Sequence, residues 1–409
     1  MTVAARRICP AIVLLLAAPA GAIEWPHVSI TGFIQPEFEV IGISAPDKAA
    51  PNLVLTDLNV APDARTQVIG FSQFRARGLF LGDKTIGQWR FDSRLELEAL
   101  PQFTLFDAYL SARRELPEKG VLRIVAGQHK APFSRQVLVW DPDLQMMGCS
   151  YCGSTTTGGL TKAWVTELAP GHQIGLSFSL NVPRAPWLQI MGGVFNGDGK
   201  NVLEHVDHNF LYVGRLSFRP INPTAPNVER ALGDDQLAIS ANAAYRNADL
   251  GDHDEARLAL GGDAFVSFRG LSAYVELVWA QTKWALHAGK ANSCPPGSPN
   301  CNDFASLGWN AQAGYLLPIP GYLYRRLEIT ARGQYIVRND NVAISAPGDP
   351  NQPHYDAAFG LNYYHLGHGL KAMLNYNHFV IPVDAAREVS RKSAYAWDAL
   401  FLMLSYKLE

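Results

Sequence analysis

The sequence predicts an all-β protein: a transmembrane antiparallel β-barrel of sixteen strands, with eighteen as the alternative count. Many stretches alternate apolar and polar residues with the two-residue period of a strand, and most exceed the ~9–11 residues that a tilted strand needs to cross a bilayer. After residue 22, no stretch stays apolar for long enough to form a spanning helix. Short and long connections follow each other between the strands, which is typical of outer-membrane barrels.

Residues 1–22 have the three parts of a secretory signal peptide. Arg6 and Arg7 form a basic start, residues 8–18 an apolar run, and residues 20–22 a small-residue cleavage site. The apolar run is too short to span a membrane. We therefore expect an exported chain whose mature part, residues 23–409, forms one barrel domain.

The first five strands are predicted at 28–41, 67–82, 87–98, 103–114 and 120–130. In the third, an apolar face of Trp89, Phe91, Leu95 and Leu97 opposes a charged face of Arg90, Asp92, Arg94, Glu96 and Glu98. In the fifth, Leu122, Ile124 and Ala126 oppose Arg123, Val125 and Gly127. One apolar and one charged face fits lipid outside the barrel and water inside it.

A polar segment without a sustained period, residues 131–170, follows the fifth strand. A strand that runs into one very long loop predicts that this third loop folds into the lumen and narrows it. Residues 154–168 contain Trp164, Val165 and Leu168 and are the alternative position for a further strand. An even strand count favours a loop there.

The remaining strands are predicted at 171–181, 187–196, 207–219, 236–247, 256–269, 271–284, 304–317, 325–338, 354–365, 369–381 and 395–408. Short turns, such as 83–86, 115–119 and 366–368, are expected in the periplasm, and long loops, such as 42–66 and 285–303, outside the cell. The connections 99–102 and 220–235 break this rule. Aromatic residues beside the short turns fit an interfacial girdle; they are Trp89, Trp187, Tyr322 and Tyr324.

Charge and cysteine content exclude several functions. With 35 basic and 37 acidic residues, the chain has no basic field for nucleic acid. Cys149 and Cys152 form one close pair and Cys294 and Cys301 another, which in an oxidising compartment predicts two local disulfides. A zinc site, a redox pair and free thiols are the alternatives.

No cofactor and no enzymatic activity are expected. The sequence has neither the Gly-x-Ser-x-Gly nor the His-Glu-x-x-His pattern. Asp249, Asp252, Asp254 and Glu255 supply oxygen atoms enough for calcium, but their spacing matches no known metal loop, so a solvated outer loop is favoured.

Five segments occur in the order FRARGLFLG (74–82), DAY (107–109), GQHKAPFS (127–134), GVFNGDG (193–199) and GRLSFRP (214–220). In these segments the chain resembles the phosphate-selective porin O and P family of outer-membrane channels. The resemblance implies a sixteen-stranded barrel, commonly a homotrimer, with an inward-folded third loop and basic residues along the pore.

Ten basic residues are candidates to line the pore and contact anions: Arg75, Arg77, Arg90, Arg94, Arg123, Lys130, Arg135, Arg215, Arg219 and Arg332. Guanidinium groups pair with phosphate or carboxylate, so a series of them would pass anions by successive weak binding. The alternative is that they pair with acids on neighbouring strands, which would cancel their field. Such acids are Asp92, Glu96, Glu98, Asp263 and Glu328.

The sequence therefore predicts a passive diffusion channel in the outer membrane of a Gram-negative bacterium, surrounded by outer-membrane lipid and lipopolysaccharide. It would pass small hydrophilic solutes, with a preference for small anions such as phosphate. The alternative is a secreted or surface-attached β-sheet protein that binds a partner and has no pore.

Overall fold

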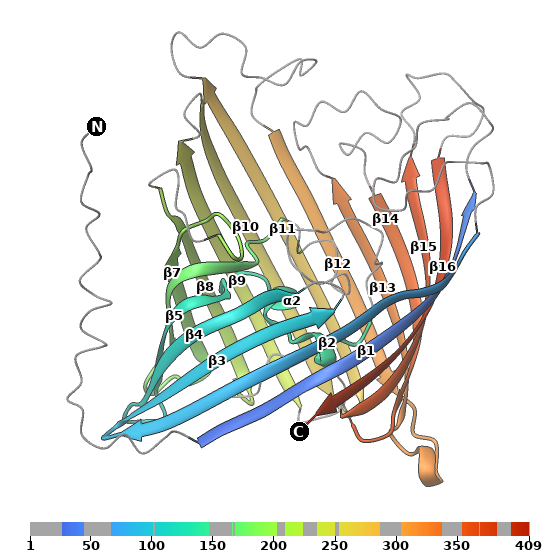
Figure 1. Ribbon diagram of the computed structural model, residues 1–409, viewed down its shortest axis with the longest axis horizontal. Helices are drawn as coiled ribbons and strands as arrows, with labels where there is room; N and C mark the ends of the chain where they lie inside the picture. Colours follow the sequence, from blue (N-terminus) through green and yellow to red (C-terminus); the bar gives the residue numbers. More distant parts are fainter. Residues whose placement is uncertain are drawn as a thin grey trace.

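The structure, a computed structural model, describes residues 27–44, 67–100, 103–146, 166, 168–202, 209–223, 235–249, 253–286, 304–337, 354–367, 369–382 and 394–408. Sixteen strands within these ranges form one closed antiparallel barrel (Figure 1). Each strand pairs with its neighbours in the chain, and β1 closes the barrel against β16. The predicted fold class and strand count are confirmed. In the described ranges, no helix is long and apolar enough to cross a membrane.

The strands of the first half are β1 (His27–Ser44), β2 (Gln67–Ile86), β3 (Trp89–Leu100), β4 (Thr104–Glu115), β5 (Val121–Lys130), β6 (His172–Asn181), β7 (Leu188–Phe195) and β8 (Leu211–Ile221). Those of the second half are β9 (Gln236–Asp249), β10 (His253–Phe268), β11 (Leu271–Leu286), β12 (Phe304–Leu316), β13 (Leu327–Val337), β14 (His354–Tyr364), β15 (Leu370–Pro382) and β16 (Ala394–Leu408). Their bounds follow the predicted ranges to within a few residues at most ends.

Tight turns join most of the strand pairs at one end of the barrel, here called the short-turn end; the connections after β8 and β12 are longer. Between β10 and β11 the turn is only Arg269 and Gly270, whose φ angles of 51° and 91° suit a two-residue hairpin. One predicted turn, 83–86, is wrong: β2 continues to Ile86, and Gly87, with φ of 60°, begins the turn instead. A left-handed backbone is cheap for glycine, so the strand continues until it reaches one.

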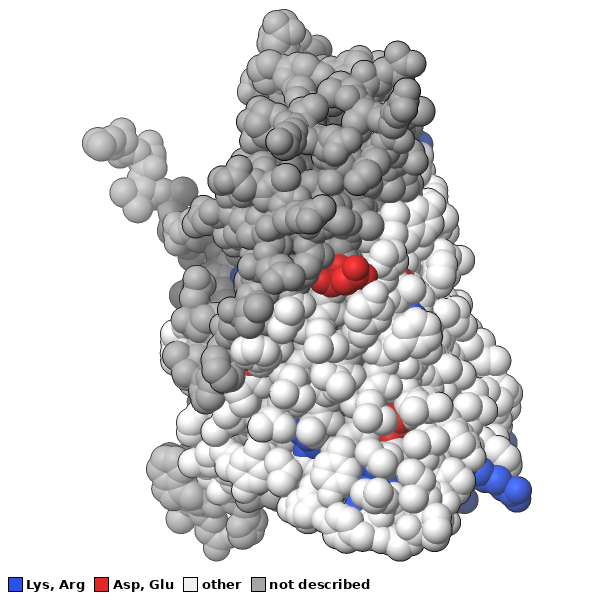
Figure 2. All heavy atoms as spheres, turned by 90° about the vertical axis from the view of Figure 1, so that its right-hand side faces the viewer, with Lys and Arg blue, Asp and Glu red and all other residues white. Residues whose placement is uncertain are grey.

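The side chains of each strand alternate between the outer wall and the interior. In β8, Tyr212, Leu216 and Phe218 are exposed on the outside, whereas Arg215 and Ser217 are buried inside. Figure 2 shows the outer wall from the right-hand side of Figure 1, where few charged side chains interrupt an uncharged surface. The predicted assignment of apolar residues to the outside is confirmed at these positions.

The interior is less polar than the alternation suggests. Ile336, Phe379 and Phe401 are fully buried on the inner side, where the prediction places water. They belong to one apolar cluster with Phe133 and Val137 of the segment that follows β5. Water is excluded there because that segment brings its own apolar side chains into the barrel.

The chain leaves the wall after an irregularity in β5. Gly127 has a φ of 124°, and a Cβ there would lie 2.3 Å from the backbone oxygen of Ala108. The alternation shifts at this point, so that Gln128 and His129 are both buried. Beyond it, α2 (Arg135–Leu138) and the 3-10 turn η1 (Asp141–Asp143) lie within the barrel (Figure 1).

Candidate functional site

The inner segment, residues 131–146, contacts the inner faces of the barrel on opposite sides. Ser134 caps α2 by accepting a hydrogen bond of 3.2 Å from the backbone N–H of Val137. On the side of β2–β4, the inner segment meets charged residues through Asp141. On the side of β11–β15, it is held through Gln145.

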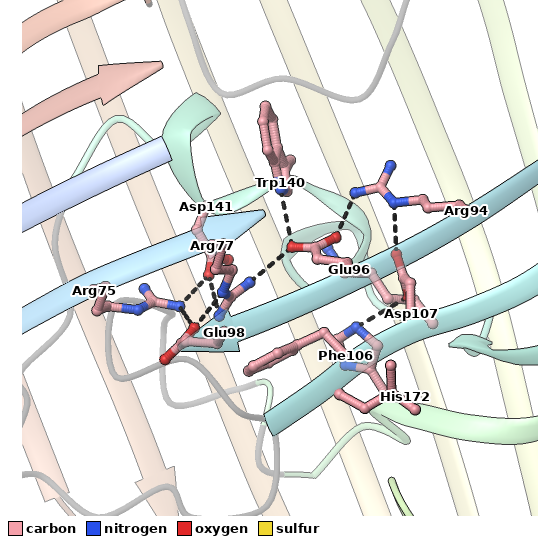
Figure 3. Close-up of polar contacts among 12 residues, drawn as sticks. Arg75, Arg77, Arg94, Glu96, Glu98, Phe106, Asp107, Trp140, Asp141 and His172 are labelled. Carbon is pink, nitrogen blue, oxygen red and sulfur yellow. Dashed lines mark hydrogen bonds and ion pairs between the residues drawn. The ribbon is translucent and has the colours of Figure 1, made fainter. Parts of the chain in front are cut away.

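The charged cluster consists of residues from β2, β3, β4, β6 and η1: Arg75, Arg77, Arg94, Glu96, Glu98, Asp107, Asp141 and His172 (Figure 3). The carboxylate of Asp141 accepts from Arg75 at 2.7 Å and from Arg77 at 3.0 Å. Arg75 also reaches Glu98 at 3.2 Å. These arginines therefore tie the inner segment to the barrel wall.

Arg77 is enclosed on all sides. It pairs with Glu96 at 3.2 Å and with Glu98, and its guanidinium carbon lies 3.7 Å from the centre of the Phe106 ring. Trp140 donates from its indole nitrogen to Glu96 at 3.3 Å. Because a buried charge needs hydrogen-bonded partners of opposite sign, this network is consistent with the acid-paired alternative for Arg77.

Arg94 and Asp107 continue the charged cluster toward β6. Arg94 pairs with Glu96 at 2.5 Å and with Asp107 at 3.0 Å, and a quarter of its side chain stays exposed. Asp107 lies 3.4 Å from Nε2 of His172. Arg94 is thus the most exposed arginine of the charged cluster.

The tip of the inner segment lies in a polar socket, called the tip socket: Ser272, Gln312, Gly314, Glu328, Asn362 and Lys371. The Gln145 amide donates to Ser272 at 2.7 Å and to Glu328, and it accepts from Gln312 at 3.0 Å. Its backbone carbonyl accepts from Asn362 at 2.8 Å. Lys371 donates to the carbonyl of Leu144 at 2.6 Å.

A second connection enters the barrel near the charged cluster. After β7, the backbone N–H of Asn201 donates to Gln128 at 2.7 Å, and Asp198 pairs with Arg246 at 2.7 Å. Lys200, between them, has its ammonium 4.6 Å from the centre of the Phe106 ring. Partial burial lowers the pKa of Lys200. Sequence reasoning missed this lysine, and its position in a Gly-Asp-Gly-Lys turn of a long-side connection was the available signal.

The ten predicted basic residues do not form one open series. Six of them are less than one-tenth exposed: Arg75, Arg77, Arg135, Arg215, Arg219 and Arg332. Arg215 pairs with Asp263 at 2.7 Å, Arg332 with Asp356 at 3.4 Å, and Arg135 stacks 4.1 Å from the Phe265 ring. Lys130 donates to the carbonyl of Val139 at 3.0 Å. Arg90 and Arg123 lie apart from these, toward the short-turn end. Contact of any of the ten with a passing anion remains a prediction.

Other predicted sites lie partly or wholly outside the described residues. Residues 1–22, the four cysteines Cys149, Cys152, Cys294 and Cys301, Asp252 and residues 154–165 are among those outside. The prediction that Asp249 and Asp254 lie in an outer loop is wrong. Asp249 of β9 and Asp254 of β10 are direct partners in the ladder, because these strands run further than predicted. Among described residues, no His, Cys, Asp and Glu side chains are grouped as a metal site requires.

Comparison with known proteins places the fold among outer-membrane channels. No protein-family model matches the sequence, and no curated protein is a detectable relative. The anion-selective porin from Comamonas acidovorans has a TM-score of 0.55 at 12% identity, covering 93% of this chain and 99% of that one. The outer-membrane channel DcaP of Acinetobacter baumannii has a TM-score of 0.55 at 12% identity, covering 95% of this chain and 99% of that one. The outer-membrane protein OmpT of Vibrio cholerae has a TM-score of 0.51 at 10% identity, covering 93% of this chain and 97% of that one. At these identities the likeness establishes a porin-type barrel fold.

Proposed function

We propose that this protein is an outer-membrane channel through which small hydrophilic solutes diffuse passively. The proposal rests on a closed barrel with an apolar outer wall and charged residues on its inner side, to which an inner segment is tied. Backbone groups in lipid must be paired internally, and a closed sheet meets that requirement. The charged side chains on the inner side then line the path for solutes.

The inner segment sets the width of this path. Residues 131–146 reach from the charged cluster on one side to the tip socket on the other. Solutes would pass beside them, past Arg94 and Lys200, whose side chains are only partly buried. Selectivity would come from these partly exposed cations and not from Arg75 or Arg77, whose charges are balanced by Glu96, Glu98 and Asp141.

A modest preference for small anions, phosphate among them, is the finer part of the proposal. It is supported by the cationic side chains that remain accessible and by the five segments that resemble the phosphate-selective porin O and P family. The same resemblance supports a homotrimer surrounded by outer-membrane lipid and lipopolysaccharide. A secreted binding protein without a pore, the alternative, would have no use for the apolar outer wall.

Two measurements test the proposal. Membrane extraction should require detergent, and the extracted protein should migrate differently on a gel before and after heating. In planar bilayers it should form stable conducting channels, with reversal potentials in KCl gradients on the anion side. Release by a salt wash together with absence of conductance would refute the channel, whereas cation selectivity would refute only the anion preference.

A further inference from the structure

Three arginines on adjacent strands form one row across the inner wall near the short-turn end. In the ladder of β3 and β4, Arg90 is the direct partner of Arg113, and in that of β4 and β5, Arg113 is the direct partner of Arg123. Direct partners on one face have Cβ atoms about 4.5–5.5 Å apart, and like charges there destabilise the sheet. The row needs a compensating charge.

The carboxylates nearby compensate one member of the row. Arg90 pairs with Asp92 at 3.0 Å and with Asp83 at 3.4 Å. Among the residues that the structure describes, the carboxylate paired with Arg113 is that of Glu115, at 3.7 Å, and the side chain of this glutamate is 83% exposed. A loose, exposed pair of this kind contributes little.

Arg123 has hydroxyl groups in place of a carboxylate. It donates to Ser111 from Nε at 3.3 Å and from Nη2 at 3.2 Å, and to the Tyr109 hydroxyl at 3.4 Å. Its guanidinium carbon lies 5.7 Å from the centre of the Tyr109 ring. Within the described part of the chain, no carboxylate pairs with Arg123. The contacts fix its guanidinium without neutralising it, and Nη1 takes no part in them.

We propose that Arg113 and Arg123 together bind one small oxyanion, such as phosphate, at the short-turn mouth of the channel. A guanidinium pair offers parallel N–H donors that match the oxygens of phosphate or carboxylate. The Arg113 side chain is 45% exposed and Arg123 is half-buried, so an anion in solution reaches both. An anion held between them supplies the missing negative charge.

The proposed oxyanion site rests on the proposed channel function but is distinct from the charged cluster. One row of residues, Asp92, Ser111 and Val125, lies between it and the row of Arg94 and Tyr109. Its position at one mouth gives the channel an electrical asymmetry, because the opposite mouth is formed by other residues. An oxyanion should therefore act differently from the two sides of a membrane.

The test uses inorganic phosphate on the full-length protein. In planar bilayers in KCl, phosphate added to one side should reduce the chloride current at a lower concentration than phosphate added to the other. Replacing Arg113 and Arg123 together by Gln should raise the half-blocking concentration on the sensitive side about tenfold, as loss of charge-assisted hydrogen bonds predicts. Arg114→Gln is the matched control, because Arg114 is adjacent in sequence but stacks on Trp89 on the outer face.

A second measurement separates failure of the site from failure of the channel. Phosphate binding to the detergent-solubilised barrel is measured by calorimetry for the native protein, the double variant and Arg114→Gln. Binding that weakens only in the double variant supports the site, even if the native protein does not conduct. Equal binding in all three, or equal block from both sides, overturns it.

Discussion

Replacing Gly314 by Ala should free the tip of the inner segment without disturbing the barrel. A Cβ at this position would lie 1.9 Å from the side-chain nitrogen of Gln145 and 2.8 Å from a carboxyl oxygen of Glu328. The backbone of β12 contributes no such clash, so the strand keeps its place and the amide of Gln145 must move. Gly314 is thus a glycine because another side chain occupies the space of its Cβ.

The energy of this change follows from the contacts of Gln145. Its amide would lose hydrogen bonds with Ser272, Glu328 and Gln312, each contributing about 1 kcal/mol net. A total of about 3 kcal/mol lowers the ratio of docked to undocked tip about 100-fold. The bonds from Asn362 and Lys371 to backbone carbonyls remain, so the tip loosens within the barrel and does not leave it.

Single-channel recording in planar bilayers measures the consequence. Gly314→Ala should give a larger and noisier conductance than the native protein, with selectivity unchanged because no charge is removed. Gly333→Ala is the control, since the nearest described atom to its Cβ would belong to Trp309, at an ordinary 3.5 Å. A heat-modifiable Gly314→Ala barrel with native conductance and native noise would refute the idea that the tip socket sets the aperture.

Three further predictions concern charge and backbone. Arg77→Gln removes one partner from a buried network and should lower stability by about 3–5 kcal/mol, whereas the half-exposed Arg90→Gln should cost less than about 1 kcal/mol; the midpoint of heat modification measures both. Although the balanced charge of Arg77 does not itself select solutes, its loss leaves Glu96 and Glu98 uncompensated, so reversal potentials should shift toward cations in Arg77→Gln. Burial lowers the pKa of Lys200, so its charge is lost at a lower pH than that of an ordinary lysine. Anion preference, measured as reversal potential, should therefore fall as pH rises through the range where Lys200 loses its proton, and this fall should be absent in Lys200→Gln. Gly127→Ala forces a Cβ against the backbone of Ala108 at a φ of 124° and should destabilise the barrel by about 1–3 kcal/mol or more. Its heat-modification midpoint should be lower than that of Gly214→Ala, where no described atom lies within 4 Å of the added Cβ.

The sequence by itself determined the wall of this protein. A strand can be predicted from its two-residue period and from the length of the connections that flank it, and both are local properties of the sequence. The charged face of 87–98 and the apolar face of 120–130 could therefore be assigned without a partner. Backbone groups that face lipid must be paired, so the sheet has to close on itself. With an even number of strands, the closing pair of β1 and β16 is antiparallel.

Only the tertiary structure decided what the inner faces do. Whether Arg77 meets a solute or Glu96 depends on the register of β2 with β3, which no local period specifies. Gln145 donates hydrogen bonds to Ser272 and Glu328, which lie 127 and 183 residues further along the chain. The sequence around residue 145 contains no pattern that predicts these contacts. Arg113 was not predicted as a site residue for the same reason, because its proposed role depends on its position opposite Arg123 in the ladder of β4 and β5. Contacts between distant segments arise from the closed shape, and a single sequence records the shape of each strand but not the partner of each side chain.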